Sequence, residues 1–208
     1  DSASHHAACL ARVKAADVVI LVGGRLGEMP SQSYSLLEIP GPRQTFVHVH
    51  PGAEELGRVY RPHLAIQAAP TGFAAALEGL QPPNDIRWRD TTATAHTDFL
   101  AWTEAATPQP GNVNLGEILV WLRDHLPPES FMCSGAGNFS TWVHRFYRLR
   151  RFATQLAPTA GSMGYGLPAA VAMARLHPDR TVVCVAGDGD FMMTGQEFST
   201  AVQYGLPV

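Results

Sequence analysis

The sequence has few cysteines and no long hydrophobic run. Its 208 residues include only Cys9, Cys133 and Cys184, and no two of them have the Cys-x-x-Cys spacing. An odd number of cysteines without that spacing excludes a disulfide framework and a cysteine-based zinc site. Because Cys133 and Cys184 lie in apolar runs, we expect both to be small buried side chains, in a protein of a reducing compartment such as the cytoplasm. No apolar run approaches the about 20 residues that a membrane-spanning helix needs.

Charged residues are also scarce. They make up 16% of the sequence, against about 25% in a typical soluble domain. The formal net charge of −3 gives no electrostatic reason to expect nucleic acid or an anionic membrane surface as a partner. The low charged fraction predicts that another domain or another subunit covers part of the surface.

Short apolar runs alternate with helical patterns along most of the chain. This alternation predicts an α/β fold with parallel sheets and flanking helices. The continuous apolar run at 17–22 ends in two glycines and is typical of a strand that is buried on both faces. A second strand is predicted at 45–50, and Thr71 is expected to cap a helix over 71–80.

Two proline-containing stretches interrupt this pattern. They bracket a polar segment at 81–111 that contains one predicted helix, over 92–105. The α/β pattern precedes this segment at 1–80 and resumes at 112–208. We therefore predict two α/β domains joined by an interdomain linker with a helix in it.

The apolar run at 181–186 is the clearest predicted strand, and it leads directly into Gly-Asp-Gly-Asp at 187–190. Ligands of open α/β sheets bind at the carboxyl ends of strands, and glycines let the backbone approach a ligand closely. A carboxylate there suits Mg²⁺, which proteins hold through one or two carboxylates plus substrate phosphates. The alternative is a tight turn in which Asp188 caps a helix. Further along, Thr194 and Glu197 match a capping box, which predicts a helix capped by Thr194.

Two motifs in the second half of the chain resemble those of thiamine-diphosphate-dependent enzymes of the acetolactate synthase and benzoylformate decarboxylase superfamily. They are AGSMGYGLPAA at 160–170 and GDGDFMMTGQEF at 187–198. The stretches at 16–27 and 46–57 resemble the second half of the central, Rossmann-like domain of that family.

The resemblance implies an identity for each segment. Residues 1–80 would be the C-terminal half of the central domain, 81–111 the linker, and 112–208 the N-terminal half of the thiamine-diphosphate-binding domain. The family also uses a second metal ligand and a glutamate from another domain, and neither is matched here. The sequence does not begin with Met. We therefore expect a fragment of a longer enzyme that holds none of its catalytic residues and is inactive alone.

The resemblance also implies roles for residues near the cofactor diphosphate. Asp188 would bind the Mg²⁺ that bridges the diphosphate, and Gly189 and Asp190 would lie beside it. Gly137 and Asn138 would belong to a loop near the same group. Most members carry Ser in place of Asp190, and an extra carboxylate near phosphate is unfavourable unless it is turned away or paired.

Three neighbouring residues would hold the organic rings of the cofactor. The backbone carbonyl of Gly161 would accept a hydrogen bond from the aminopyrimidine, and the backbone N–H of Met163 would meet a pyrimidine nitrogen, with Ser162 between them. The Met163 side chain would wedge between the two rings and keep the bent conformation that the chemistry needs. Core packing of Met163 is the alternative.

The activity that the resemblance implies is decarboxylation of a 2-oxo acid followed by carboligation, as in acetolactate synthase, by a homodimer or homotetramer. A simple 2-oxo acid decarboxylase of the same superfamily is one alternative. A non-catalytic nucleotide-binding or interaction module is another. A Rossmann dehydrogenase is disfavoured because neither glycine cluster has the required spacing.

The first half of the chain offers weaker signals. Some relatives bind FAD through the central domain, but the acidic-rich sequence that flavin-binding acetolactate synthases carry is absent after Arg25, which disfavours FAD. His48 and His50 share a strand face, so a metal pair is geometrically possible, although a structural role is the commoner one. In the second half, the basic run at 144–151 predicts a solvated or intersubunit face, or alternatively a group that holds an anion.

Overall fold

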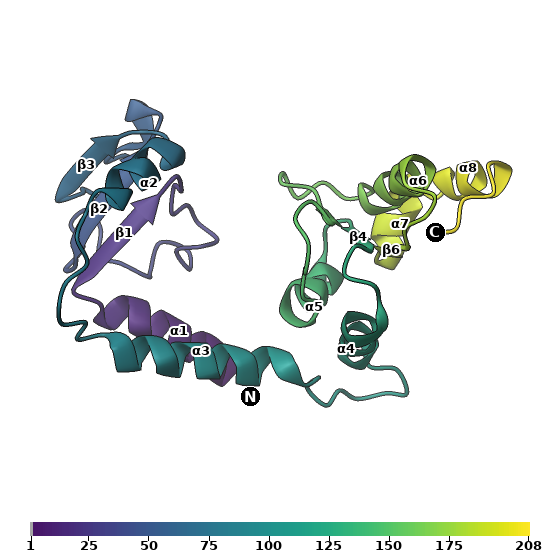
Figure 1. The fold of residues 1–208 in the computed structure, drawn as a ribbon, viewed down its shortest axis with the longest axis horizontal. Coiled ribbons are helices and arrows are strands. Elements are labelled where there is room, and N and C mark those ends of the chain that lie inside the picture. Colours follow the sequence, from purple (N-terminus) through teal and green to yellow (C-terminus); the bar gives the residue numbers. More distant parts are fainter. Residues whose placement is uncertain (1) are drawn as a thin grey trace. The chain divides into compact units, whose positions relative to one another are not determined.

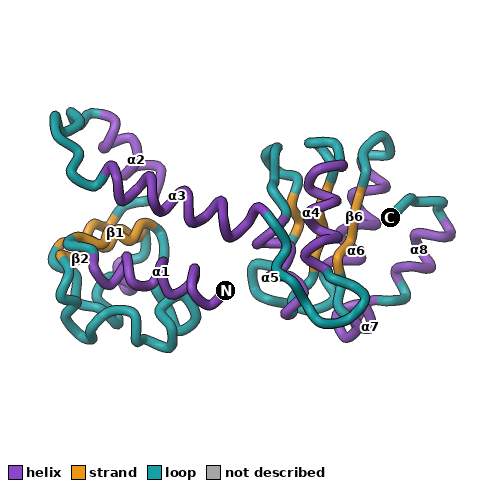
Figure 2. Tube along the Cα trace, turned by 90° about the horizontal axis from the view of Figure 1, so that it is seen from below, coloured by secondary structure: helices purple, strands orange, loops and turns teal. Residues whose placement is uncertain are grey.

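The computed structural model describes residues 2–208, which form two compact units that divide between Asp98 and Phe99. Each unit contains a sheet of three parallel strands with helices beside it (Figure 1). The predicted α/β class with parallel sheets and flanking helices is therefore confirmed. The boundary falls inside α3 (Arg89–Glu104), the long helix of the proline-bracketed segment, which Figure 2 shows as one continuous helix.

The first unit has the strand order β1-β2-β3. Its elements are α1 (Ser2–Ala15), β1 (Val18–Val22), β2 (Thr45–His50), the short 3-10 helix η1 (Ala53–Glu55), β3 (Leu64–Gln67) and α2 (Pro70–Glu78). The core of the unit contains Leu36, Leu37, Phe46 and Tyr60, and Val19 and Leu21 of β1 pack against it.

The expected burial of the first strand on both faces is wrong. Val18, Ile20 and Val22 are 51%, 56% and 41% exposed, because β1 is an edge strand and the described residues cover only its other face. The cap expected at Thr71 is also wrong. The helix begins at Pro70, with Ala69 as its cap, because the fixed φ of proline suits the first helical position.

The second unit has the strand order β5-β4-β6. Its remaining elements are α4 (Leu115–His125), β4 (Phe131–Ser134), α5 (Asn138–Phe146), β5 (Gln155–Leu156), α6 (Gly166–Leu176), β6 (Val182–Val185), α7 (Asp188–Thr194) and α8 (Glu197–Gln203). The central strand β4 is buried on both faces. Phe131 and Cys133 pack with α6, whereas Met132 packs with α4 and α5.

Helix α5 and strand β5 lie where the sequence predicted only a loop and a basic run. Arg145 of that run donates from Nε to the carbonyl of Trp102, at 3.0 Å, and from a terminal nitrogen to Thr107 Oγ1, at 2.8 Å. Its guanidinium lies over the Trp102 ring, 4.9 Å from the centroid, and burial lowers its pKa. Arg148 pairs with Glu104. These contacts match neither interpretation of the run, because Arg145 and Arg148 hold the segment that precedes α4.

Among residues 2–208, no helix is both long enough and apolar enough to cross a membrane.

The packing predicts a difference in thiol reactivity. Burial raises the pKa of Cys133 to about 12 and that of Cys184 to about 11, whereas Cys9 is exposed. Because the thiolate is the reactive form, the two buried groups should stay protonated and unreactive at about pH 8. We expect a thiol reagent to label one cysteine in the native chain and three after unfolding in denaturant. Rapid labelling of two or three in the native chain would contradict this packing.

Candidate functional site

Three glycine-rich turns meet at one edge of the second sheet. Strands β4 and β6 pair in parallel with Ser134 opposite Val185, so the turns that follow them, at 135–138 and 187–190, emerge at the same edge. The third turn, at 161–165, precedes α6. A Cβ on Gly166 would lie 2.7 Å from the backbone nitrogen of Gly135, so the start of α6 lies directly against the end of β4. Figure 1 shows β4, β6, α6 and α7 grouped in this unit.

The structure brings together the residues that the sequence singled out. Seven of these residues are exposed: Gly137, Asn138, Gly161, Ser162, Met163, Asp188 and Gly189. The exception is Asp190, whose exposed fraction is 2%.

Asp188 is the first residue of α7 and follows the cap residue Gly187. Its carboxylate is exposed, and it makes no hydrogen bond or ion pair within the part of the chain that the structure describes. The alternative in which Asp188 caps a helix is therefore not observed. An exposed, unengaged carboxylate at the carboxyl edge of a sheet fits Mg²⁺ bound to a phosphate ligand.

That carboxylate would be the metal contact of the site. Among residues 2–208, no three His, Cys, Asp or Glu side chains gather closely enough to hold a metal ion. A site of this kind needs the ligand itself to complete the coordination, which is the usual arrangement for Mg²⁺ bound with substrate phosphates.

Met163 reaches the 187–190 turn from the neighbouring loop. Its Cε would lie 3.4 Å from a Cβ placed on Gly189, and the residue remains 47% exposed. A half-exposed methionine over a glycine differs from the core packing that was the alternative. Gly161, two residues earlier, has a φ of +70° and open space where a Cβ would be, so it suits close approach of a ligand.

Gly164 is fixed from both sides. Its N–H donates to Asp190 Oδ1, at 2.8 Å, and its carbonyl accepts from the Thr194 hydroxyl, also at 2.8 Å. Its φ is +82°, and a Cβ would lie 2.8 Å from the Cβ of Met193. Only glycine fits this turn without strain.

The helix cap predicted at Thr194 is wrong. Helix α7 already includes Thr194, and α8 begins later, at Glu197, with Gln196 as its cap. The Thr194 hydroxyl is instead used for the contact with Gly164. The capping-box pattern is local, whereas this acceptor comes from a distant part of the chain.

Phe139 is a further residue of the site that the sequence did not indicate. A Cβ on Gly137 or on Gly187 would lie 2.8 Å from its ring, so the aromatic side chain packs beside two of the turns. The only signal for it was an aromatic residue directly after a Gly-Asn pair.

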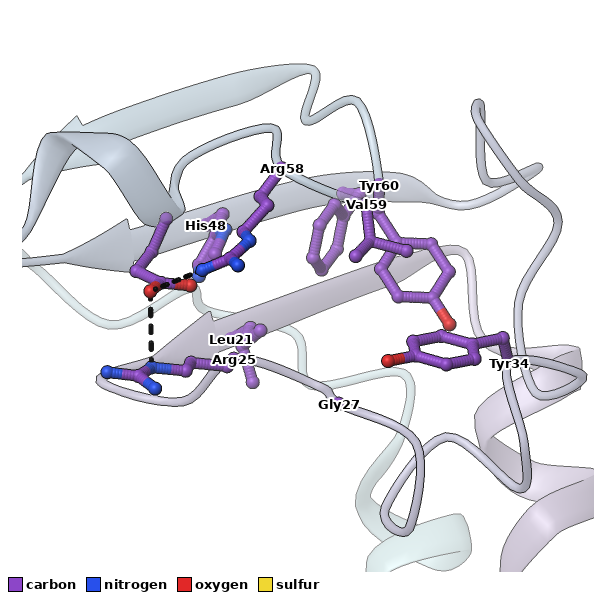
Figure 3. A pocket seen from close by; sticks show the side chains of 10 residues that line it. Leu21, Arg25, Gly27, Tyr34, His48, Arg58, Val59 and Tyr60 are labelled. Atoms are coloured by element: carbon purple, nitrogen blue, oxygen red, sulfur yellow. Dashed lines mark hydrogen bonds and ion pairs between the residues drawn. The ribbon is translucent and has the colours of Figure 1, made fainter.

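The first unit holds a separate cavity of about 170 Å³ (Figure 3). Glu55, which is 8% exposed, lines it and pairs with Arg58, at 3.1 Å, and with Arg25, at 3.5 Å. The volume is below the roughly 300–1,000 Å³ of typical ligand pockets. His48 and His50 both contact backbone groups, of Gly24 and Gly52, which favours their structural role.

Two family models match the chain. "Thiamine pyrophosphate enzyme, central domain" matches residues 2–77, and "Thiamine pyrophosphate enzyme, C-terminal TPP binding domain" matches residues 135–208. The second match contains all three glycine-rich turns of the site.

Curated proteins are also similar. The acetolactate synthase isozyme 1 large subunit of Escherichia coli is 30% identical over 196 residues, which cover 93% of this chain and 34% of that protein. The isozyme 2 large subunit of Escherichia coli is 27% identical over 198 residues, or 94% and 34%. A candidate acetolactate synthase large subunit of Mycobacterium tuberculosis is 31% identical over 195 residues, or 92% and 34%. The chain spans about a third of the length of these relatives.

Thr194→Val tests the contact that fixes the third turn. The substitution keeps the shape of the side chain and leaves the Gly164 carbonyl without its donor, so we expect a loss of about 1–2 kcal/mol in the free energy of unfolding of the second unit. Urea denaturation followed by circular dichroism measures it. Thr181→Val, at an exposed position, is the matched control and should change stability by less than about 0.5 kcal/mol. Equal effects of the two substitutions would argue against the contact.

Proposed function

The chain belongs to the thiamine pyrophosphate enzyme family, and we propose that its second unit holds thiamine diphosphate and Mg²⁺ at the three glycine-rich turns. The observation that carries the proposal is the meeting of an unengaged Asp188 carboxylate with a half-exposed Met163 at one sheet edge. A Mg²⁺ ion bound to phosphate needs a carboxylate ligand such as Asp188. An organic ring that packs over glycine turns suits contact with an apolar, unbranched side chain such as Met163.

Each exposed residue of the site has a proposed part in binding. Asp188 would hold the Mg²⁺, with Gly189 beside the diphosphate and Gly137 and Asn138 on the neighbouring loop. The backbones of Gly161 and Met163 would meet the aminopyrimidine, with Ser162 between them. The Met163 side chain would support the bent conformation of the cofactor.

We propose a 2-oxo acid as the substrate class of the whole protein, with decarboxylation followed by carboligation as its reaction. The relatives that cover this chain are acetolactate synthase large subunits, which is the support for this choice. Thiamine diphosphate supplies an electron sink for such chemistry. The contribution of these 208 residues is to bind and orient the cofactor. We propose that they bind it without turning over substrate.

We also propose that α7 and α8 lie against a second subunit or another domain. Met192, Phe198 and Val202 are 77%, 51% and 69% exposed, which is unusual for large apolar side chains that gather on two short helices. A homodimer or homotetramer in the cytoplasm would cover them. The net charge of −3 agrees with a small-molecule partner in preference to nucleic acid.

We infer that the cavity of the first unit does not hold FAD. The diphosphate of FAD would bring negative charge toward the buried Glu55 carboxylate, which already occupies Arg25 and Arg58. Like charges at short distance repel strongly away from water.

Asp188→Asn tests the metal contact. Because an amide replaces the carboxylate ligand without a change of shape, we expect Mg²⁺-dependent binding of thiamine diphosphate to weaken by at least about 100-fold. Isothermal titration calorimetry of the 208-residue chain measures it. Asp179→Asn, at another exposed aspartate of the same unit, should bind as the unaltered chain does. Unchanged binding in Asp188→Asn would contradict the assignment.

A further inference from the structure

Asp190 joins all three glycine-rich turns through one buried side chain. It lies in the 187–190 turn, and its Oδ1 accepts from the N–H of Gly164, at 2.8 Å, and from the N–H of Ala136, at 3.2 Å. Its exposed fraction is 2%. Within residues 2–208, no cation pairs with this carboxylate, so the two backbone N–H groups are its partners there.

The surrounding backbone is shaped to accept this side chain. A Cβ on Gly135 would overlap the Asp190 carboxylate, so that position must be glycine while the carboxylate is present. On the other side, Thr194 holds the carbonyl of Gly164 while Asp190 holds its N–H. A polar group buried in this way is favourable only where its hydrogen bonds are made, which gives the arrangement a single well-defined geometry.

The bonded amides flank the residues that face the ligand. Gly164 directly follows Met163, and Ala136 directly precedes Gly137, while Asp188 lies two residues before Asp190 on α7. A constraint at these points therefore acts on the backbone of every turn that borders the proposed cofactor. Because the Asp190 side chain is buried, it acts on these turns from the protein interior and not from the side that the ligand would occupy.

We propose that Asp190 is a positioning residue that fixes the 135–138 and 161–165 turns against α7 before the cofactor binds, and that it is not itself a ligand of the diphosphate. The proposal rests on the proposed function for the identity of the ligand. It explains how this chain accommodates a carboxylate where a diphosphate is expected. The carboxylate is turned inward, where its Oδ1 accepts from two backbone N–H groups.

The pKa of Cys184 agrees with the inward direction. This residue lies on β6, and after burial the nearby Asp190 is the second cause of its raised pKa. A carboxylate that pointed outward to the ligand would lie away from the strand.

The test compares Asp190→Ala with Asp190→Asn in the 208-residue chain without cofactor. Asparagine keeps a carbonyl oxygen that can accept from both amides, whereas alanine removes the acceptor. We expect hydrogen exchange of the Gly164 and Ala136 amides, followed by NMR, to accelerate on the order of 10- to 100-fold in Asp190→Ala. The acceleration should be smaller in Asp190→Asn. Unchanged exchange in Asp190→Ala would overturn the proposal.

Binding of thiamine diphosphate with Mg²⁺ separates this proposal from the proposed function. Asp190→Ala should bind more weakly and exchange faster, whereas Asp188→Asn should bind more weakly with unchanged exchange. Weaker binding in Asp190→Ala without faster exchange would make Asp190 a ligand and overturn the positioning role. If the unaltered chain does not bind the cofactor, the proposed function fails, and the exchange data still decide whether Asp190 fixes the turns.

A double substitution keeps the test valid if Asp190→Ala alone unfolds the chain. We expect Gly135→Ala to lower the urea midpoint of the second unit when Asp190 is present, because the added methyl group overlaps the carboxylate. The same change should have a much smaller effect in the Asp190→Ala background, where the overlapping atoms are removed, and a reduced effect in Asp190→Ser if alanine does not fold. It should have about the full effect in Asp190→Asn, which keeps the shape of the aspartate side chain. Equal midpoint shifts with Asp190 and with the shortened side chain would overturn the proposed packing of Asp190 against Gly135.

Discussion

The parallel pairing of β4 with β6 is the constraint on which the candidate site depends. Ser134 and Val185 end their strands side by side, so the turns that follow begin at one edge of the sheet. Helix α6 then packs on both strands and brings the third turn to the same place. Since β4 is covered on one face by α6 and on the other by α4 and α5, this edge rests on the most buried strand of the unit.

Close backbone approach is the second requirement of the site. Gly135, Gly164 and Gly166 each occupy a point where a Cβ would meet neighbouring atoms, and Gly164 also needs a positive φ. Small residues alone would leave such turns mobile, because glycine loses more conformational freedom on folding than any other residue. The hydrogen bonds from Thr194 and to Asp190 offset that cost at Gly164, where the backbone passes between the half-exposed Met163 and α6.

The parts of this arrangement that sequence predicted are those with a local signal. An apolar run followed by glycines indicated β6 and the exposed Asp188, and the paired motifs indicated that Met163 lies near them. The same local logic failed for Thr194, because a capping box contains no information about an acceptor thirty residues away. It failed also for Val18 and Ile20, since an apolar run cannot show how many of its faces other elements cover.

Asp190 shows most clearly what could not be predicted from local sequence. Its position in the motif suggested a place beside the diphosphate, and its charge indicated that it must be turned away or paired. Whether the side chain points toward the diphosphate or into the protein depends on the N–H donors of Gly164 and Ala136, which belong to other turns. Helix α5 was missed for a related reason, because its buried residue Phe146 lies within the basic run at 144–151 and Val143 directly precedes that run.

Paramagnetic broadening by Mn²⁺ is the most direct test that the cofactor and its metal bind at this sheet edge. Mn²⁺ prefers the same oxygen ligands as Mg²⁺ and broadens the NMR signals of nearby nuclei. With thiamine diphosphate present, the amide signals of Gly189, Met163 and Gly137 should broaden first. Broadening centred instead on the Glu54–Glu55 region of the first unit, with these three signals unaffected, would contradict a cofactor site at the three turns.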